Sequence, residues 1–368
     1  MTRPRMEISP SAIKENTQCI VKRLKSFNCQ VVGVTKSCCG DPVVARSMLD
    51  GGVSMIGDSR LENINKMRQA GINTDFMLLR LPMLSEVESV VDTADVSLNS
   101  EIEVIRSLSS CAKAKGKVQR IILMVDLGDL REGVWPSDLI KTVQRVIDLP
   151  GIHLEGIGAN FACYGGVIPT REKIDQLIGL KEQISAVCGY SAPVVSGGNS
   201  ANLQMIWNGE TPFGVNQLRI GEGILLGRET VQRKPLQGLR QDAFTLFAEI
   251  IEIKEKQSVP IGETGQDVMG KRPNFPDKGF RLRAILALGR QDVYTEGLAP
   301  CAANINIIGS SSDHLIVDVT DSDIRWRIGM EIPFSVDYAA LMSAMASPYI
   351  EKVIKPPGEM DPRKRQGA

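Results

Sequence analysis

One lysine of the sequence stands where its amine could act as a nucleophile. Lys36 follows the apolar residues 31–35 (VVGVT), which predict a buried strand. An amine at the end of such a strand loses part of its hydration, so its pKa falls and the neutral form can attack an aldehyde. The alternative is a solvated surface lysine, so the neighbouring segments must decide between the two interpretations.

Two short glycine-rich segments could bind a phosphate group. Residues 196–200 (SGGNS) and residues 221–223 (GEG) follow the seventh and eighth predicted strands. Backbone N–H groups in such turns form phosphate sites together with a serine hydroxyl. Each segment alone is also compatible with an ordinary tight turn. Their positions favour a phosphate site, because the loops after strands seven and eight of an eight-stranded α/β barrel commonly bind phosphate.

The composition excludes several other functions. Lysine plus arginine and aspartate plus glutamate both number 43 among 368 residues, so nothing favours nucleic acid or an anionic membrane surface as a partner. No apolar run is long enough for a membrane span and no signal peptide is visible, so we expect a cytoplasmic protein. Two histidines argue against a metal site and a Ser-His-Asp hydrolase. The eight cysteines are expected to be buried thiols.

The apolar pattern predicts an α/β fold, a (β/α)8 barrel of the TIM type, because eight strand and helix units alternate. A doubly wound open sheet is the competing arrangement, but no G-x-G-x-x-G follows the first strand. Helical patterns lie between the strands, as at residues 42–50, where Asp41 is a suitable N-cap. The predicted strands cover residues 30–35, 53–57, 75–81, 95–98, 120–125, 153–159, 192–195 and 217–220.

The active site of such a barrel forms at the C-terminal ends of its strands. Polar side chains gather at these positions, which is typical of a lined pocket. They are Lys36, Asp58, Ser59, Arg80, Asn99, Asp126, Asn160, Ser196, Asn199 and Arg219.

After Gly227, short β-rich segments are separated by Gly, Pro, Ser and Asp, which indicates a second, all-β domain. A Gly- and Pro-rich loop is expected at residues 258–278. We therefore expect a cofactor-binding barrel at residues 1–235, a C-terminal β domain at residues 236–355, and a disordered tail at residues 356–368. The predicted strands of the second domain cover residues 243–256, 280–288, 303–308, 314–319 and 332–334, followed by a helix at residues 337–345.

Several segments occur in a recognisable order: residues 31–40 (VVGVTKSCCG), 126–133 (DLGDLREG), 158–164 (GANFACY), 196–200 (SGGNS), 218–223 (LRIGEG) and 309–314 (GSSSDH). Together they resemble the fold-type III pyridoxal-phosphate (PLP) enzymes related to alanine racemase, and most closely the ornithine racemase branch. The resemblance runs from about Pro4 to Tyr349. It implies a PLP-binding barrel followed by a C-terminal domain that contributes one segment to the site.

The resemblance implies roles for individual residues. Lys36 would form a Schiff base with PLP and carry a proton on one face of the substrate α-carbon. Arg219 would hydrogen-bond the pyridine nitrogen, and because arginine stays charged it would not readily protonate that nitrogen, which suits racemisation. Arg131 would act near the cofactor oxygen and the substrate carboxylate. The implied cofactor-binding residues are Lys36, Asn160, Ser196, Asn199, Ser200, Arg219, Gly221, Glu222, Gly223 and Tyr349.

The sequence departs from the alanine racemase pattern at two points. Those enzymes use a tyrosine from the partner subunit as a second base, but the matching segment here contains Arg290, which is a poor proton acceptor. Asn160 stands where alanine racemases commonly stack a histidine on the ring. Ser312 resembles a cysteine of related decarboxylases and is a catalytic candidate. Candidates for the second base are Tyr294, Asp292, Cys301 and Ser312, and candidate substrate contacts are Arg290, Asp292 and Asp313.

The sequence therefore predicts a PLP-dependent racemase of a small or basic amino acid, with ornithine as the expected substrate. A basic side chain would need a carboxylate, such as Asp292 or Asp313. The alternatives are an alanine racemase, a decarboxylase of the same fold, a non-catalytic PLP carrier and a barrel without cofactor. Arg219 argues against a decarboxylase, and the second domain argues against a carrier. The resemblance also implies a head-to-tail homodimer with shared active sites.

Overall fold

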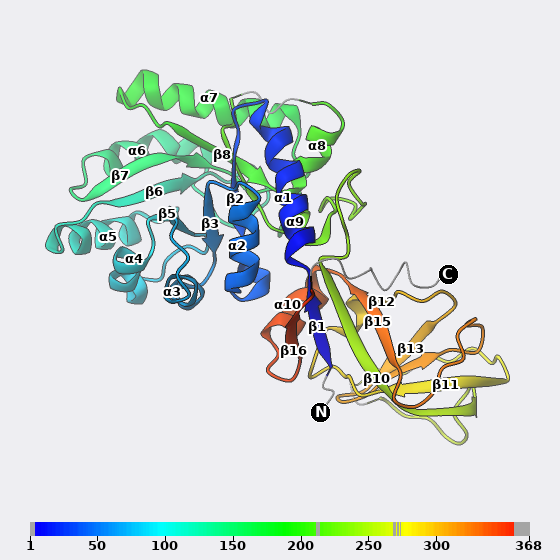
Figure 1. Cartoon of the computed structure of the whole chain (residues 1–368). Coiled ribbons are helices and arrows are strands. Elements are labelled where there is room, and N and C mark those ends of the chain that lie inside the picture. The colour runs from blue at the N-terminus through cyan, green and yellow to red at the C-terminus, as the bar shows by residue number, and fades with distance from the viewer. Residues whose placement is uncertain (1–3, 211–213, 268–269, 271, 273, 357–368) are drawn as a thin grey trace. The chain divides into compact units, whose positions relative to one another are not determined.

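The computed structural model describes residues 4–210, 214–267, 270, 272 and 274–356. The chain divides into two compact units (Figure 1). One unit is Ser11–Gln241, and the other combines Met1–Pro10 with Asp242–Ala368. The described residues 4–10 thus belong to the C-terminal unit, whereas the sequence placed them with the barrel. The predicted tail at residues 356–368 lies outside the described residues except for Pro356.

Eight parallel strands close into a barrel within Ser11–Gln241. The first and last of them, β2 (Gln30–Val34) and β9 (Gln217–Ile220), pair with each other and so close the sheet. The predicted TIM-type barrel is confirmed, and the open doubly wound sheet is excluded. The strands between them are β3 (Met55–Asp58), β4 (Phe76–Leu78), β5 (Val96–Asn99), β6 (Gln119–Met124), β7 (Ile152–Gly158) and β8 (Val194–Asn199).

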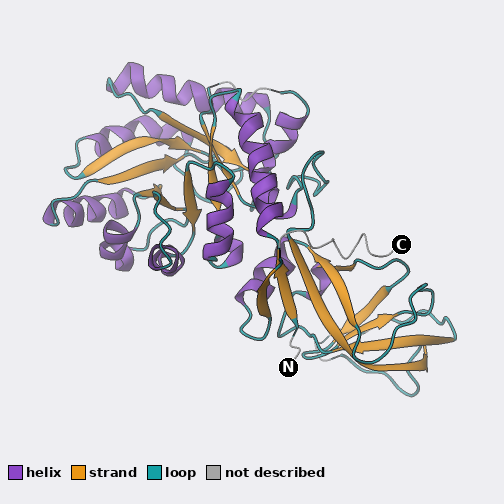
Figure 2. Cartoon of the chain, viewed as in Figure 1, coloured by secondary structure: helices purple, strands orange, loops and turns teal. Residues whose placement is uncertain are grey.

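The helices of this unit lie around its strands (Figure 2). The predicted N-cap of α2 (Pro42–Asp50) is confirmed, because Asp41 Oδ1 accepts hydrogen bonds from the N–H groups of Val43 at 2.9 Å and Val44 at 3.2 Å. The other helices are α1 (Pro10–Lys25), α3 (Leu61–Gln69), α4 (Val87–Thr93), α5 (Ile102–Ala114), α6 (Leu139–Ile147), α7 (Arg171–Cys188), α8 (Leu203–Trp207) and α9 (Glu222–Leu226).

Apolar side chains fill the interior of the barrel. Each is at most 8% exposed, and burying a side chain of this size contributes about 1.5–3 kcal/mol to stability. The interior is therefore a packed core, and the site is restricted to the loops at the ends of the strands. The cluster consists of Val32, Met55, Met77, Val96, Leu98, Ile122 and Met124.

The C-terminal unit is built on one eight-stranded sheet. Its central path runs β12-β15-β10-β11-β14-β13, and β1 (Arg5–Ile8) pairs with both β10 and β16. The helix α10 (Tyr338–Ala346) belongs to this unit. The remaining strands are β10 (Phe244–Gln257), β11 (Phe280–Leu286), β12 (Leu298–Pro300), β13 (Asn306–Ser310), β14 (Leu315–Asp318), β15 (Glu331–Val336) and β16 (Glu351–Ile354).

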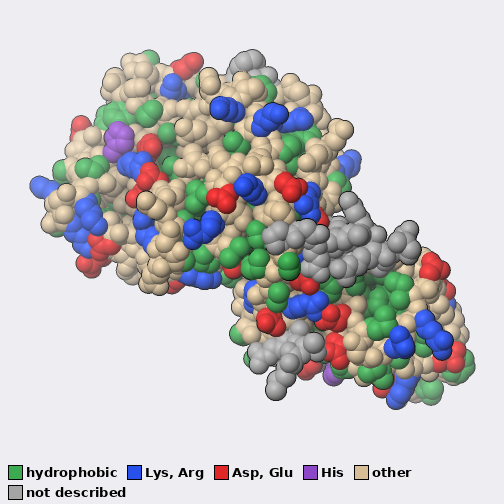
Figure 3. Space-filling model, in the orientation of Figure 1, with side chains coloured by type: hydrophobic (Ala, Val, Ile, Leu, Met, Phe, Trp, Pro, Cys, Tyr) green, Lys and Arg blue, Asp and Glu red, His purple; other side chains and the backbone are tan. Residues whose placement is uncertain are grey.

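The predicted loop at residues 258–278 has no helix or strand among its described residues. The surfaces of both units carry mixed charges, since Figure 3 shows lysine and arginine interspersed with aspartate and glutamate on the visible face. Within the described part of the chain, none of the helices combines the length and the apolar character that crossing a bilayer requires.

Candidate active site

Lys36 begins a 3-10 turn, Lys36–Cys38, directly after β2. The turn continues through Cys39 and Gly40, whose φ angles are 51° and 57°. A Cβ on Gly40 would lie 2.6 Å from the Cβ of Asn63, so only glycine fits there. This local geometry holds Lys36 at the C-terminal end of the first barrel strand, as the sequence predicted.

The pKa of Lys36 is lowered by its surroundings. Burial by the barrel walls is the largest cause, although the side chain itself remains open to water at the rim of the barrel. The positive charges of Arg131 and Arg219 lower the pKa further, while Cys163 and Glu132 oppose this shift. A larger fraction of the amine is therefore neutral than in a surface lysine.

A buried carboxylate lies at the end of the neighbouring strand. Asp58 is fully buried and accepts hydrogen bonds from Thr35 Oγ1 at 2.8 Å, Asn63 Nδ2 at 2.9 Å and the Arg60 N–H at 3.0 Å. Burial raises the pKa of Asp58, and hydrogen bonds from Asn63, Thr35 and the backbone of Ser59, with the charge of Lys36, oppose the shift. The carboxylate therefore anchors the residue that precedes Lys36.

Arg219 lies on β9 and is only 4% exposed. Its Nη1 donates to Ser196 O at 3.1 Å and to Ser196 Oγ, and its Nη2 donates to Ala159 O at 2.7 Å and Asn160 Oδ1 at 2.8 Å. Burial lowers the pKa of Arg219 to about 10, with Glu132 opposing this and Arg131 adding to it. The guanidinium is thus held rigidly by four acceptors.

The segment after β6 folds into a tight loop that presents Arg131. Asp126 Oδ1 accepts from the N–H groups of Gly128 at 2.8 Å and Leu130 at 3.2 Å. A Cβ on Gly133 would lie 2.3 Å from the nitrogen of Asp126, so the loop requires glycine at that position. Asp126 and Gly133 are therefore required by the conformation of this loop.

Arg131 is paired with its neighbour in sequence. Its Nε and Nη2 donate to the two carboxylate oxygens of Glu132, and its Nη1 donates to Cys163 Sγ at 2.6 Å. Burial lowers the pKa of Arg131, but the contacts with Glu132 outweigh it and raise the pKa overall. The expectation of buried thiols holds only for Cys29 and Cys38, since Cys163 is exposed and the other five cysteines are partly exposed.

Glu132 also binds Asn160, whose Nδ2 donates to Glu132 Oε1. Sequence reasoning assigned no role to Glu132. In the sequence, Glu132 is visible only as an acidic residue next to Arg131. Its contact with Asn160 could not be predicted, because it joins the loops after two different strands. Glu132 thus links Arg131 to Asn160 and, through Asn160, to Arg219.

The two glycine-rich segments meet at one hydroxyl group. Ser200 Oγ accepts hydrogen bonds from the N–H groups of Gly221 at 3.3 Å and Gly223 at 3.1 Å. The two N–H groups therefore converge on one point, which is the geometry of an anion site. The carboxylate of Glu222 instead accepts from Arg228 Nε at 2.9 Å.

Ser196 and Asn199 have structural partners in the protein. Ser196 Oγ donates to Gln217 Oε1 at 2.8 Å and supports Arg219. Asn199 Oδ1 accepts from the Ala201 N–H at 2.9 Å, and its Nδ2 donates to Phe161 O at 2.8 Å. These side chains shape the loops that carry the other site residues.

At the barrel rim, Arg80 donates to Glu86 at 2.6 Å and Asn99 donates to Ser97 O at 3.0 Å. Other predicted residues belong to the C-terminal unit, where two segments pack against each other. Arg290 N donates to Ser311 O at 3.0 Å, and a Cβ on Gly289 would lie 2.1 Å from Ser312 O. Ser312 Oγ donates to Asp313 Oδ2 at 2.7 Å. The structure thus brings together residues that are about 20 positions apart in sequence.

The side chains of these two segments of the C-terminal unit form ion pairs and hydrogen bonds with different partners. Arg290 pairs with Glu296 at 2.7 Å. Asp292 Oδ2 accepts from the Gly289 N–H at 2.8 Å, and burial, with the charge of Asp313, raises the pKa of Asp292. The exposed aromatic side chains of this unit include Tyr294, by 48%, and Tyr349, by 58%.

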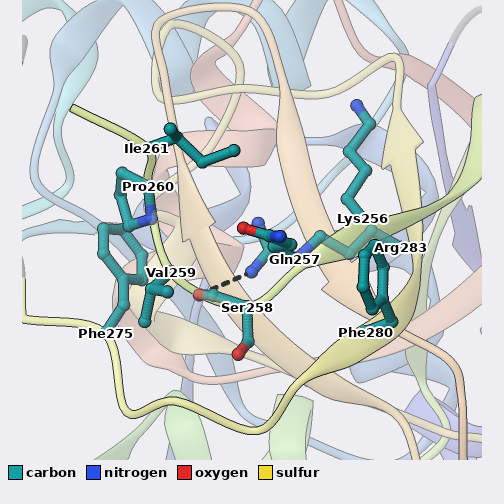
Figure 4. A pocket seen from close by; sticks show the side chains of 9 residues that line it. All are labelled: Lys256, Gln257, Ser258, Val259, Pro260, Ile261, Phe275, Phe280 and Arg283. Atoms are coloured by element: carbon teal, nitrogen blue, oxygen red, sulfur yellow. Dashed lines mark hydrogen bonds between the residues drawn. The ribbon is translucent and has the colours of Figure 1, made fainter.

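A pocket of about 570 Å³ in the C-terminal unit contains none of the predicted site residues. It is lined by the end of β10, the start of β11 and the loop between them, with Phe275 and Phe280 among its walls (Figure 4). Arg283 Nη2 donates to Ser258 O at 2.8 Å at its edge. It holds no pair of groups suited to proton transfer.

Comparison with known proteins identifies the family. Residues 8–228 match the family model described as "Alanine racemase, N-terminal domain". A lysine racemase of Thermotoga maritima is 42% identical over 97% of this chain and 99% of its own length. An ornithine racemase of Acetoanaerobium sticklandii is 41% identical over 95% of this chain and 99% of its own length. The chain belongs to the alanine racemase family.

Solved structures show the same fold at low sequence identity. An alanine racemase of Streptomyces lavendulae covers 99% of both chains with a TM-score of 0.75 at 19% identity. A histidine racemase of Leuconostoc mesenteroides covers 96% of this chain and 98% of its own, with a TM-score of 0.70 at 17% identity. The barrel followed by a β domain is therefore the architecture of this family.

Proposed function

We propose that this chain is a PLP-dependent racemase that interconverts the L and D forms of a basic amino acid, ornithine or lysine. The observation that carries the proposal is the position of Lys36 at the C-terminal end of a barrel strand, beside Arg131 and Arg219, in a chain of this family. Its lowered pKa increases the neutral fraction of the amine, which is the form that reacts with an aldehyde.

The described residues fit PLP at two places. The four hydrogen bonds of the Arg219 guanidinium come from Nη1 and Nη2, and its Nε–H, which none of them uses, suits a pyridine nitrogen as acceptor. The Ser200 hydroxyl, which accepts from the N–H groups of Gly221 and Gly223, can still donate its own proton to a phosphate. When bound, PLP makes the α-proton of the attached amino acid acidic by withdrawing electrons from the α-carbon.

Three residues of the chain then have separate roles. Lys36 Nζ takes and returns the proton on one face of the α-carbon. Arg131 remains a cation, because its pKa is raised, and binds the α-carboxylate of the substrate. Arg219, with a pKa of about 10, also stays protonated at neutral pH. It donates a hydrogen bond without giving up its proton, which limits side reactions.

The proposed substrate is a basic amino acid because two relatives act on lysine and ornithine, as their names state. Their near-equal identities of 42% and 41% give no reason to prefer ornithine over lysine. A basic side chain needs an anionic partner, and we propose Asp292 or Asp313 for this role, with Arg290 nearby. The second base would come from the same unit, from Tyr294, Asp292, Cys301 or Ser312.

We also propose a head-to-tail homodimer, located in the cytoplasm, in which the C-terminal unit of one subunit completes the site of the other. The exposed Tyr294 and Tyr349 support this, since large aromatic side chains are enriched at interfaces. Sedimentation velocity of the purified protein tests it, and a monomer at working concentrations contradicts it.

The function is tested with purified protein supplied with PLP and with L-ornithine, L-lysine or L-alanine. Chiral chromatography should detect the D form of ornithine or lysine, and NMR in deuterated water should show loss of the α-proton signal. Lys36→Ala should abolish both. Absence of inversion and exchange with all three amino acids excludes the proposal. Release of carbon dioxide would instead indicate a decarboxylase, and slow PLP release without turnover a carrier.

A further inference from the structure

Glu132 makes contacts with two residues of the proposed site at once. Its side chain is 13% exposed, and both of its carboxylate oxygens accept hydrogen bonds from Arg131. Oε1 also accepts from Asn160 Nδ2. Asn160 Oδ1 in turn accepts from Arg219 Nη2 at 2.8 Å. A continuous chain of polar contacts therefore connects the loops after β6 and β7 with strand β9.

We propose that Glu132 is a positioning residue, whose carboxylate holds Arg131 and Asn160 in fixed orientations and thereby aligns Arg131 with Arg219 across the site. This inference rests on the proposed function. Glu132 needs no contact with substrate or cofactor for this role. It acts through the two residues that it binds.

The charges explain why a carboxylate is required at this position. Arg131 and Arg219 are both cations close enough to Lys36 to influence it, and two guanidinium groups repel each other in a partly buried site. Glu132 offsets this repulsion with its single negative charge. A neutral residue would leave two cations without compensation, and Arg131 would swing toward solvent.

The bidentate contact explains why the geometry is specific. A planar guanidinium paired with a carboxylate through two parallel N–H···O contacts has one favourable orientation. A glutamine retains only one acceptor oxygen, and its amide N–H2 group would face the donors of Arg131 or Asn160. Glu132→Gln therefore loses at least one of the contacts while the volume of the side chain is kept.

Glu132 is one of several titratable groups that face Lys36. The others are Arg131, Arg219, Cys163 and Asp58. A negative charge favours the protonated amine, so removal of the Glu132 charge should make Lys36 reactive at lower pH. This gives a measurement on the apoprotein that does not depend on racemisation.

The test compares wild type, Glu132→Gln, Glu132→Asp and the control Glu103→Gln. Glu103 forms an exposed ion pair with Arg106 on α5, so its loss should change nothing. The first measurement is the rate at which each apoprotein captures PLP between about pH 6 and pH 10, followed by the visible absorption of the bound cofactor. The second is kcat and KM for the amino-acid substrate.

Glu132→Gln should shift the pH midpoint of PLP capture downward and lower kcat/KM by about 10- to 100-fold. Glu132→Asp keeps the charge but is one methylene shorter. It should leave the midpoint near that of wild type and still lower kcat/KM severalfold, since it cannot reach both partners. The double variant Glu132→Gln with Asn160→Ala should lose less than the product of the single losses, because both break one network.

A Glu132→Gln protein with the midpoint and kcat/KM of wild type overturns the inference, as does a double variant whose losses multiply. If Glu132→Gln does not fold, the Glu132→Asp variant tests the inference instead. Wild-type kinetics in Glu132→Asp would then overturn the inference. If the proposed function is wrong, wild type would capture PLP without racemising any amino acid. The pH midpoint of PLP capture would still test the positioning role of Glu132. Wild type that captures no PLP overturns both.

Discussion

Thr35, the residue before Lys36, donates a 2.8 Å hydrogen bond from its Oγ1 to Oδ2 of the fully buried Asp58. The pair ties the end of β2 to the end of β3, and Asn63 supports the same carboxylate at 2.9 Å. The position of Lys36 therefore depends on a buried acid that takes no part in the proposed reaction.

Asp58→Asn should change how stability depends on pH. Burial raises the pKa of Asp58 in the folded protein above its unfolded value, so the folded state holds the proton more tightly. The stability that this provides is greatest at low pH and is lost as pH rises through the folded pKa. The unfolding temperature of wild-type apoprotein, minus that of Asp58→Asn, should therefore increase as pH falls through the raised pKa toward about 4, the ordinary pKa of an unfolded aspartate.

Differential scanning calorimetry of both apoproteins measures this difference. A difference that stays constant or decreases on acidification contradicts the raised pKa.

Arg219→Lys should be costly although it conserves charge. One ammonium cannot replace the two terminal nitrogens that bind Ser196, Ala159 and Asn160, so buried acceptors are left without partners. We expect a loss of about 2–4 kcal/mol in the free energy of unfolding and a fall of about 100-fold in kcat/KM. Urea denaturation and steady-state kinetics check both values, and wild-type stability in this variant would show that the cage around Arg219 is dispensable.

Ser200→Ala should weaken PLP binding. The hydroxyl on which the N–H groups of Gly221 and Gly223 converge would be lost, and with it one contact to the phosphate. The dissociation constant of PLP should rise about tenfold. Ser110→Ala is the matched control, since Ser110 Oγ donates to Arg106 O on the exposed side of α5. Equal PLP affinity in the Ser200 and Ser110 variants would contradict the phosphate assignment.

Asp313→Asn should reduce activity selectively for basic amino acids. If this carboxylate binds the terminal amine of the substrate, kcat/KM for ornithine and lysine should fall about tenfold while that for alanine stays constant. The hydrogen bond from Ser312 at 2.7 Å can persist, because the asparagine amide oxygen also accepts. A proportional loss for all three amino acids would indicate a structural role for Asp313 instead.

Much of the fold could be predicted from local patterns. The barrel strands are apolar runs of regular spacing, and each predicted run overlaps an observed strand, from β2 to β9. The strands β1, β12 and β16, of three or four residues each, were missed, although β4 is equally short and was predicted. β1 also carries Arg5 and Glu7, and it is a strand because β10 and β16 provide partners that lie far away in sequence.

The sequence by itself determined which residue types occupy the ends of the barrel strands, and it thereby indicated an amine, two arginines and a phosphate loop. Only the tertiary structure decided how they are connected. Asn160 makes hydrogen bonds with both Glu132 and Arg219, and Ser196 accepts a hydrogen bond from Arg219. These contacts form because parallel strands bring residues from different loops to one rim. Hydrogen bonds of this kind depend on distances through space, which no spacing along the chain encodes.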